Sequence, residues 1–113
     1  MKLLLTIALF TILPNTVLAH GDHAPKVANC SKECTKEQVE NAIPASVEIL
    51  VNAGRIEAAW TTAKIDKVEK KYFKKGAEWV AVLVDDKLPE NKKRRYIFIT
   101  TKGYLNGSNT TGE

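Results

Sequence analysis

The chain has 113 residues and a formal net charge of +4, from 17 basic and 13 acidic side chains. That length allows one domain with a modest core, and the charge is too small to indicate nucleic acid as a partner, since nucleic-acid binders usually concentrate basic residues on one face. We therefore expect a single small domain with no nucleic-acid partner.

The first 19 residues have the three parts of an export signal. Lys2 supplies a positive charge, residues 3–13 form an apolar run, and small or slim residues precede a predicted cut between Ala19 and His20. The apolar run is much shorter than the roughly 20 residues that span a bilayer as a helix. We expect cleavage to release a periplasmic or secreted protein that keeps no stable membrane anchor.

Residues 20–34 follow the predicted cut and read as a flexible leader that carries both histidines and both cysteines. Up to Asn29 it contains glycine and proline and almost nothing large to bury. We expect the folded part of the chain to begin after it, as an α+β domain over residues 35–106.

A helix is predicted over residues 35–53. Thr35 and Gln38 have the spacing of a capping box, apolar residues recur every three or four positions, and Gly54 is placed to end the helix. Pro44 is the misfit, because proline lacks a backbone donor and clashes with the preceding turn. Since the apolar stripe continues through Pro44, we expect one kinked helix.

The period of the sequence then changes to two, which predicts strands over residues 63–73, 78–84 and 94–101. The second strand is apolar on both faces and should be central, whereas the first is highly charged and should lie at an edge. A short last strand is expected over 104–106, followed by a flexible tail over 107–113. The predicted fold is a helix packed on a three- to four-stranded antiparallel meander, with Trp60 closing one end of the core.

Five segments carry a resemblance to a known group of proteins: His20-Gly21-Asp22-His23, Glu78-Trp79-Val80, Tyr96-Ile97-Phe98-Ile99-Thr100, Gly103-Tyr104-Leu105 and Thr111-Gly112. In these, the chain resembles an uncharacterised family of small exported bacterial proteins with a His-Gly-Asp-His mature N-terminus. The layout is also similar to the PepSY domain and to cystatin-like folds. That resemblance implies a non-catalytic module that binds an envelope protein or regulates a peptidase.

The predicted cleavage gives His20 a free α-amine beside its own imidazole. An amine and a ring nitrogen of one residue can chelate a metal ion, and His23 and Asp22 add an imidazole and a carboxylate. Nitrogen-rich sites of this kind suit Cu(II) first, with Zn(II) or Ni(II) as alternatives. We therefore predict a metal site at His20, Asp22 and His23; the alternative is a polar leader that binds no metal.

Cys30 and Cys34 are the only cysteines and stand just before the predicted helix. In an oxidising compartment such a pair is usually a disulfide. The alternatives are free thiols or a thiolate site shared with the leader histidines, which would favour Cu(I) or Zn(II). The spacing is not that of redox-active pairs, so we do not expect a thiol oxidoreductase.

The remaining sequence offers no catalytic constellation. Both histidines lie in the leader, the cysteines are expected to pair, and no two carboxylates stand in an obvious apolar segment. The basic run Lys92-Lys93-Arg94-Arg95 could bind phosphate or an acidic partner, but because it follows a predicted turn, a solvated loop is the better interpretation. The sequence therefore predicts a protein that is not an enzyme, with metal binding as the first hypothesis and protein interaction as the second.

Overall fold

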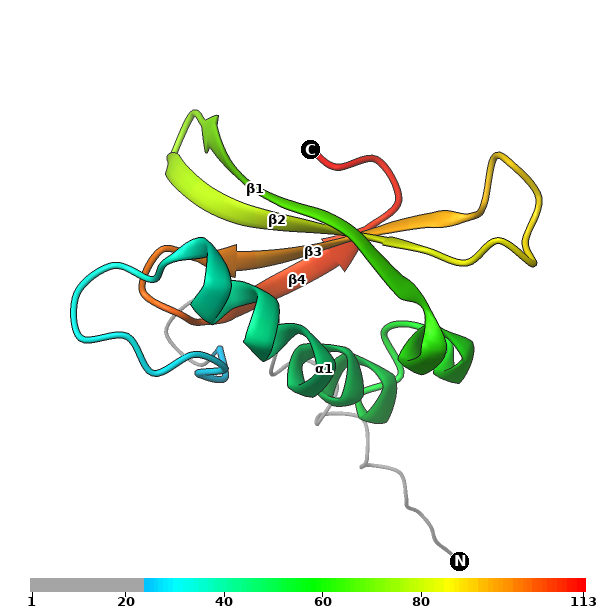
Figure 1. Ribbon diagram of the computed structural model, residues 1–113, viewed down its shortest axis with the longest axis horizontal. Coiled ribbons are helices and arrows are strands. Elements are labelled where there is room, and N and C mark those ends of the chain that lie inside the picture. Colours follow the sequence, from blue (N-terminus) through cyan, green and yellow to red (C-terminus); the bar gives the residue numbers. More distant parts are fainter. Residues whose placement is uncertain (1–23) are drawn as a thin grey trace, which may run out of the picture.

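The computed structural model describes residues 24–113, and these form one helix packed on a four-stranded antiparallel sheet (Figure 1). The α+β fold predicted from the sequence is confirmed. The elements in chain order are α1 (Lys36–Asn52), the short 3₁₀ helix η4 (Ala58–Thr62), β1 (Lys64–Phe73), β2 (Gly76–Val84), β3 (Arg94–Thr100) and β4 (Leu105–Asn109). None of the helices in this part of the chain is long and apolar enough to cross a bilayer.

Helix α1 begins and ends as its sequence predicts. The hydroxyl of Thr35 accepts from the amide of Gln38, and the Gln38 side chain accepts in return from the amide of Thr35. After Ala53, the chain leaves the helix through Gly54, whose φ of 73° lies in the left-handed region. Pro44 lies inside the helix on its exposed side, and the element continues through it, as expected.

The four strands lie in the order β1-β2-β3-β4, so each pairs with its neighbour in sequence. Strand β2 is therefore internal and the charged β1 lies at an edge, and both predictions are confirmed. The prediction for β4 was too short: it continues to Asn109. Gly107 and the small polar residues after it have a low intrinsic preference for strands, so the sequence pattern there did not indicate pairing with β3.

The helix covers only one face of the sheet. Its buried stripe packs with alternate residues of the strands and with Trp60 from η4, which is 5% exposed, at the position predicted for it. The main residues of this core are Val39, Ile43, Val47, Leu50, Trp60, Val68, Ala81, Leu83, Ile97, Ile99 and Leu105. The residues that alternate with these along the strands point to the other face of the sheet. Several of them are also buried but lie outside this cluster, among them Val80, Val82 and Phe98.

The segment after β4, part of the tail predicted for residues 107–113, turns back toward the sheet. The Asn109 side chain accepts from the amides of Thr111 and Gly112, which turns the chain back. Gly112 is buried, and a Cβ added there would lie 3.0 Å from the ring of Tyr96. The C-terminal residues therefore lie on the side of the sheet opposite α1 (Figure 1). A local side-chain turn and one aromatic contact hold them there.

Candidate functional site

The predicted metal ligands His20, Asp22 and His23 lie outside the described residues, as does the predicted cleavage site. The structure instead describes the chain that follows them. Ala24 is 8% exposed, and the carbonyl of Pro25 accepts from the amide of Leu105 at 2.8 Å. The first described residues are thus packed against the start of β4.

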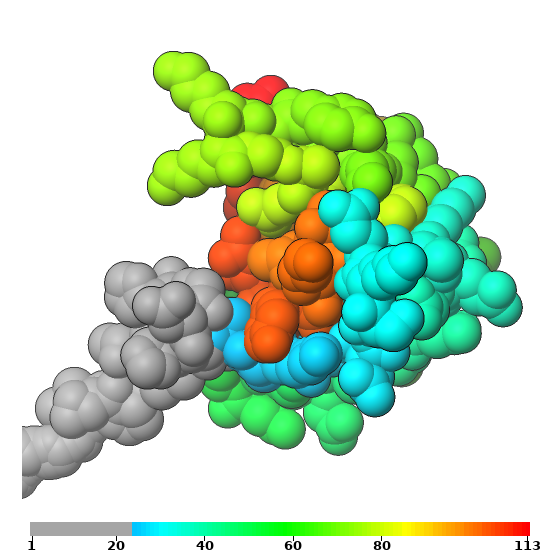
Figure 2. Space-filling view, turned by 90° about the vertical axis from the view of Figure 1, so that its left-hand side faces the viewer, coloured from blue at the N-terminus to red at the C-terminus, as the bar shows by residue number. Residues whose placement is uncertain are grey.

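Residues 24–28 contact the turn between β3 and β4, and we call this the leader contact. The carbonyl oxygen of Gly103 accepts from the amides of Val27 and Ala28 at 2.8 and 3.1 Å, and Lys26 forms an isolated bridge with Tyr104. Figure 2 shows the blue leader segment against the orange turn. Of the leader predicted for residues 20–34, the structure describes the part from residue 24 onward, and that part pairs with this turn. Backbone hydrogen bonds to a turn that is distant in sequence hold this segment, although it has no large apolar side chains to bury.

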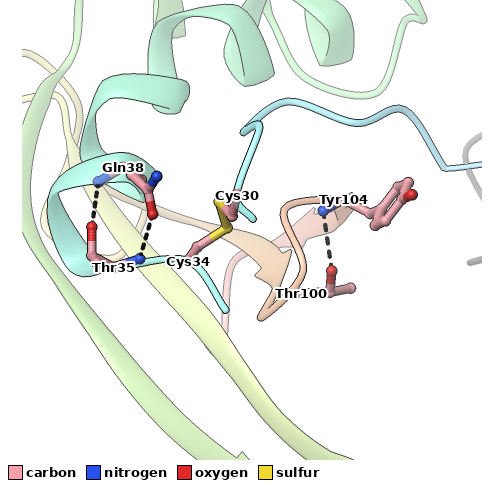
Figure 3. The surroundings of a disulfide bond; sticks show 6 residues. All are labelled: Cys30, Cys34, Thr35, Gln38, Thr100 and Tyr104. Carbon is pink, nitrogen blue, oxygen red and sulfur yellow. Dashed lines mark hydrogen bonds between the residues drawn. A yellow bond between two sulfur atoms is a disulfide. The ribbon is translucent and has the colours of Figure 1, made fainter. Parts of the chain in front are cut away.

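The leader contact continues into a disulfide between Cys30 and Cys34, whose Cα atoms are 5.1 Å apart (Figure 3). The predicted pairing is confirmed, and a disulfide cannot serve as the thiolate site considered as an alternative. Both cysteines are buried in the helix-side core, and the amide of Cys34 donates to the carbonyl of Thr101 at 2.8 Å. The disulfide thus joins the leader, the start of α1 and the β3–β4 turn.

On the sheet face opposite α1, a groove of about 390 Å³ has an aromatic floor. Phe73 and Phe98 meet edge to face in it, with ring centroids 6.2 Å apart. Arg55 and Glu113 contribute to its lining, together with the segment of β4 from Asn106 to Asn109. The groove therefore combines apolar contact area with a strand edge at its side, which is a common arrangement for holding an extended segment.

Charge in the groove is mainly acidic. The two carboxylate oxygens of Glu78 accept from the amide group of Asn106 at 3.2 and 3.0 Å, which joins β2 to β4 across the floor. Glu113 adds a second carboxylate and Arg55 the single cation among the lining residues. This balance favours a ligand that brings apolar groups together with positive charge.

The basic run at the start of β3 divides into two parts. Arg94 donates to Glu90 at 3.1 Å, and Lys93 lies 3.4 Å from Asp86 and 3.5 Å from Glu90. The hydrogen bond from Arg94, with the charge of Lys93, holds the pKa of the exposed Glu90 below its usual value. Arg95 belongs to none of these pairs. As the residue after Arg94 in β3, it lies on the opposite face of the sheet, near Trp60. The prediction of a solvated loop therefore describes the exposed Lys92, whereas Lys93 is partly buried in its ion pairs and Arg94 and Arg95 begin β3.

The whole chain, residues 1–113, matches a family described only as a family of unknown function, DUF6488. The chain belongs to the DUF6488 family. That agrees with the uncharacterised family expected from the sequence. No curated protein and no solved structure matches the chain.

Sequence reasoning missed both the groove and the leader contact in this DUF6488 chain. The groove depends on Phe73 and Phe98, which are far apart in sequence and meet only because β1, β2 and β3 pair in the observed register. One signal was present: the strand now called β2 is apolar on both faces, which indicates that the face away from the helix is also covered or used.

Proposed function

We propose that the chain is an exported, non-enzymatic protein that binds copper through its mature N-terminus. Cleavage after Ala19 would create the α-amine of His20, and this amine, the imidazole of His20 and that of His23 would supply nitrogen ligands for Cu(II). Asp22 would add a carboxylate. Export to the periplasm or beyond fits the Cys30–Cys34 disulfide, since disulfides persist in oxidising compartments.

The observation that supports this proposal best is the leader contact. Ala24 is buried one residue after His23, and the amides of Val27 and Ala28 are bonded to Gly103. Any ligand set at residues 20–23 is therefore attached directly to the edge of a folded domain. The disulfide supports nitrogen rather than thiolate ligation, because both sulfurs are bonded to each other.

The proposal is tested by titrating the exported, processed protein with Cu(II) in the presence of a competing chelator. His20→Ala and His23→Ala should each weaken binding at least about tenfold, because each removes one imidazole ligand. Binding should also weaken as the pH falls below about 6.5, because imidazole and amine must lose protons to bind the metal.

A further form keeps both imidazoles and removes only the amine: the processed protein with the α-amine of His20 acetylated. This form should also bind copper more weakly than the parent. If His20→Ala and His23→Ala bind as tightly as the parent, the proposed site does not exist.

The groove favours a second candidate function, a protein-interaction module of the PepSY-like or cystatin-like kind. An extended partner segment with apolar and basic side chains would fit the Phe73–Phe98 floor and the carboxylates of Glu78 and Glu113. Within residues 24–113, no strand pairs with the outer edge of β4 beyond the leader contact, so a partner strand could add there. Removal of residues 20–23 separates the candidates, because copper binding would be lost and capture by the groove retained.

A further inference from the structure

A second cavity lies between η4, the β2–β3 loop and the end of β4, and it shares no residue with the groove. Its volume is about 590 Å³, within the range of small-molecule sites. Trp60 and Ala59 from η4 form part of its wall with Leu88 from the loop, and Arg95 and Lys92 bring positive charge. We call it the Arg95 pocket.

Arg95 is the residue that makes this pocket unusual. Its guanidinium carbon lies 5.9 Å from the centroid of the Trp60 ring, and its Nη1 donates to Ser108 at 3.1 Å. Its Nε is buried without a hydrogen-bond partner. None of the ion pairs within residues 24–113 includes Arg95, in contrast to its neighbour Arg94.

A cation in such a place is under-satisfied. A guanidinium has five N–H donors and a full positive charge; the Nη1 bond to Ser108 uses one donor, and no carboxylate within residues 24–113 pairs with Arg95, so a ligand oxygen that reaches the terminal nitrogens would gain a charge-assisted hydrogen bond. The cation–π contact with Trp60 and the bond to Ser108 hold the side chain in position, so the pocket keeps a fixed cation beside an apolar wall. The geometry therefore calls for an anionic acceptor.

The net charge of the lining residues and the apolar side chains in the pocket wall indicate which type of anion would fit. Arg95 and Lys92 carry two positive charges, and Glu57 carries one negative charge, so the lining has a net charge of +1. A single carboxylate matches that balance, whereas a phosphate dianion would exceed it and face Glu57. Leu88 is 36% exposed beside the pocket, and together with Trp60 it offers contact to an apolar body.

We propose that the Arg95 pocket binds a carboxylate carried on an apolar body. Arg95 holds the carboxylate with assistance from Lys92, and Trp60 and Leu88 contact the apolar part. Glu57 fixes the ring of Trp60, because its carboxylate accepts from the indole nitrogen at 3.3 Å. The same chemistry is offered by a free medium-chain acid and by the C-terminus of a peptide. The proposal rests neither on copper binding nor on the groove, although Ser108, which holds Arg95, also belongs to the groove lining.

The test measures binding of octanoate and of an acetylated Ala-Leu-Leu peptide acid by calorimetry, each beside its uncharged amide. The acids should bind and the amides should not. Arg95→Gln should weaken binding at least about tenfold, and Lys92→Gln about threefold. Arg94→Gln is the matched control, since Arg94 is adjacent in sequence but paired with Glu90, and it should bind within about twofold of the parent.

Tighter binding of octanoate would identify a free acid as the ligand, and tighter binding of the peptide acid a C-terminus; either result supports the pocket. The indole resonance of Trp60, assigned with Trp79→Phe, should shift on binding. If circular dichroism shows that Arg95→Gln is unfolded, the test rests on Lys92→Gln, which changes an exposed side chain and should still weaken binding of the acids. Equal binding of acids and amides, no binding at about 10 mM, or binding unaffected by these substitutions would overturn the proposal.

Discussion

Gly103 is the residue on which the leader contact depends. Its φ of 97° lies where only glycine is unstrained, and its carbonyl oxygen accepts two of the three backbone bonds of the leader contact. A Cβ added there would collide with the carbonyl oxygen of Ala28 and lie 3.2 Å from the sulfur of Cys34. Both the turn and the close approach of the leader therefore require glycine at this position.

Gly103→Ala is expected to lower the free energy of unfolding by about 3 kcal/mol, from backbone strain and from displacement of the leader. Gly54→Ala is a matched control, because Gly54 also has a positive φ but nothing lies within 4 Å of an added Cβ. That control should cost only about 1 kcal/mol of strain. Urea unfolding followed by circular dichroism measures both. Equal costs for the two variants would contradict the close packing of leader and turn.

Single residues were predictable from the sequence where their chemistry is local. The pairing of Cys30 with Cys34 and the capping box of Thr35 with Gln38 depend on neighbours within four positions. Arg95 was not distinguishable from the rest of its basic run. Its separate environment arises from strand alternation, which places it on the face of Trp60 while Arg94 reaches Glu90.

Among the elements, α1 shows a conflict between local preference and packing. Pro44 removes one amide donor from the helix interior, yet α1 continues from Lys36 to Asn52. The buried stripe on both sides of Pro44 explains this, since Val39 and Ile43 precede it and Val47 and Leu50 follow it in the same core. Tertiary burial therefore outweighs a proline that would otherwise end the helix.

Pro44→Ala should raise the free energy of unfolding by about 2 kcal/mol. The helix would regain a hydrogen bond and lose a steric clash worth about 3 kcal/mol, offset by the greater freedom of the unfolded chain. Thermal and urea unfolding measure the change. Glu48→Ala, at an exposed position one turn later, is the control and should change stability by less than about 0.5 kcal/mol. A destabilised Pro44→Ala would mean that the sheet requires the proline geometry.

Periodicity predicted the elements well and their ends less well. The helix and β1 begin within one residue of the expected positions, because the apolar pattern changes there. Strand β2 begins two residues earlier than expected, at Gly76, and β4 ends three residues later, at Asn109. Both misjudged ends contain glycine or small polar residues, which pair through the backbone without leaving an apolar pattern.

At the scale of the whole molecule, the leader contact could not have been predicted. Residues 24–28 contain only small or polar side chains and one valine, so nothing in their composition indicates packing. Their partners, Gly103 to Leu105, lie about 75 residues further along the chain. The contact forms because the helix and sheet bring the β3–β4 turn beside the start of α1, and the disulfide shortens the path between them.

Two truncations of the processed protein test what this contact contributes. One removes residues 20–23 and the other removes residues 20–28. Only the longer deletion removes the three backbone bonds to Gly103 and Leu105 and the buried side chains of Ala24 and Ala28. We expect it to be less stable than the shorter one by on the order of 2 kcal/mol, since each net hydrogen bond contributes about 1 kcal/mol and chain ordering offsets part.

The same pair of proteins separates the proposed functions. Both should lose tight Cu(II) binding, because both lack His20 and His23, whereas the shorter deletion should retain any partner held in the groove and any acid held at Arg95. Urea unfolding and Cu(II) titration are measured on the same samples, so that loss of copper binding is not confused with loss of fold. Equal stability of the two truncations would show that the leader contact does not stabilise the domain. Tight copper binding by the shorter deletion would place the metal elsewhere in the chain.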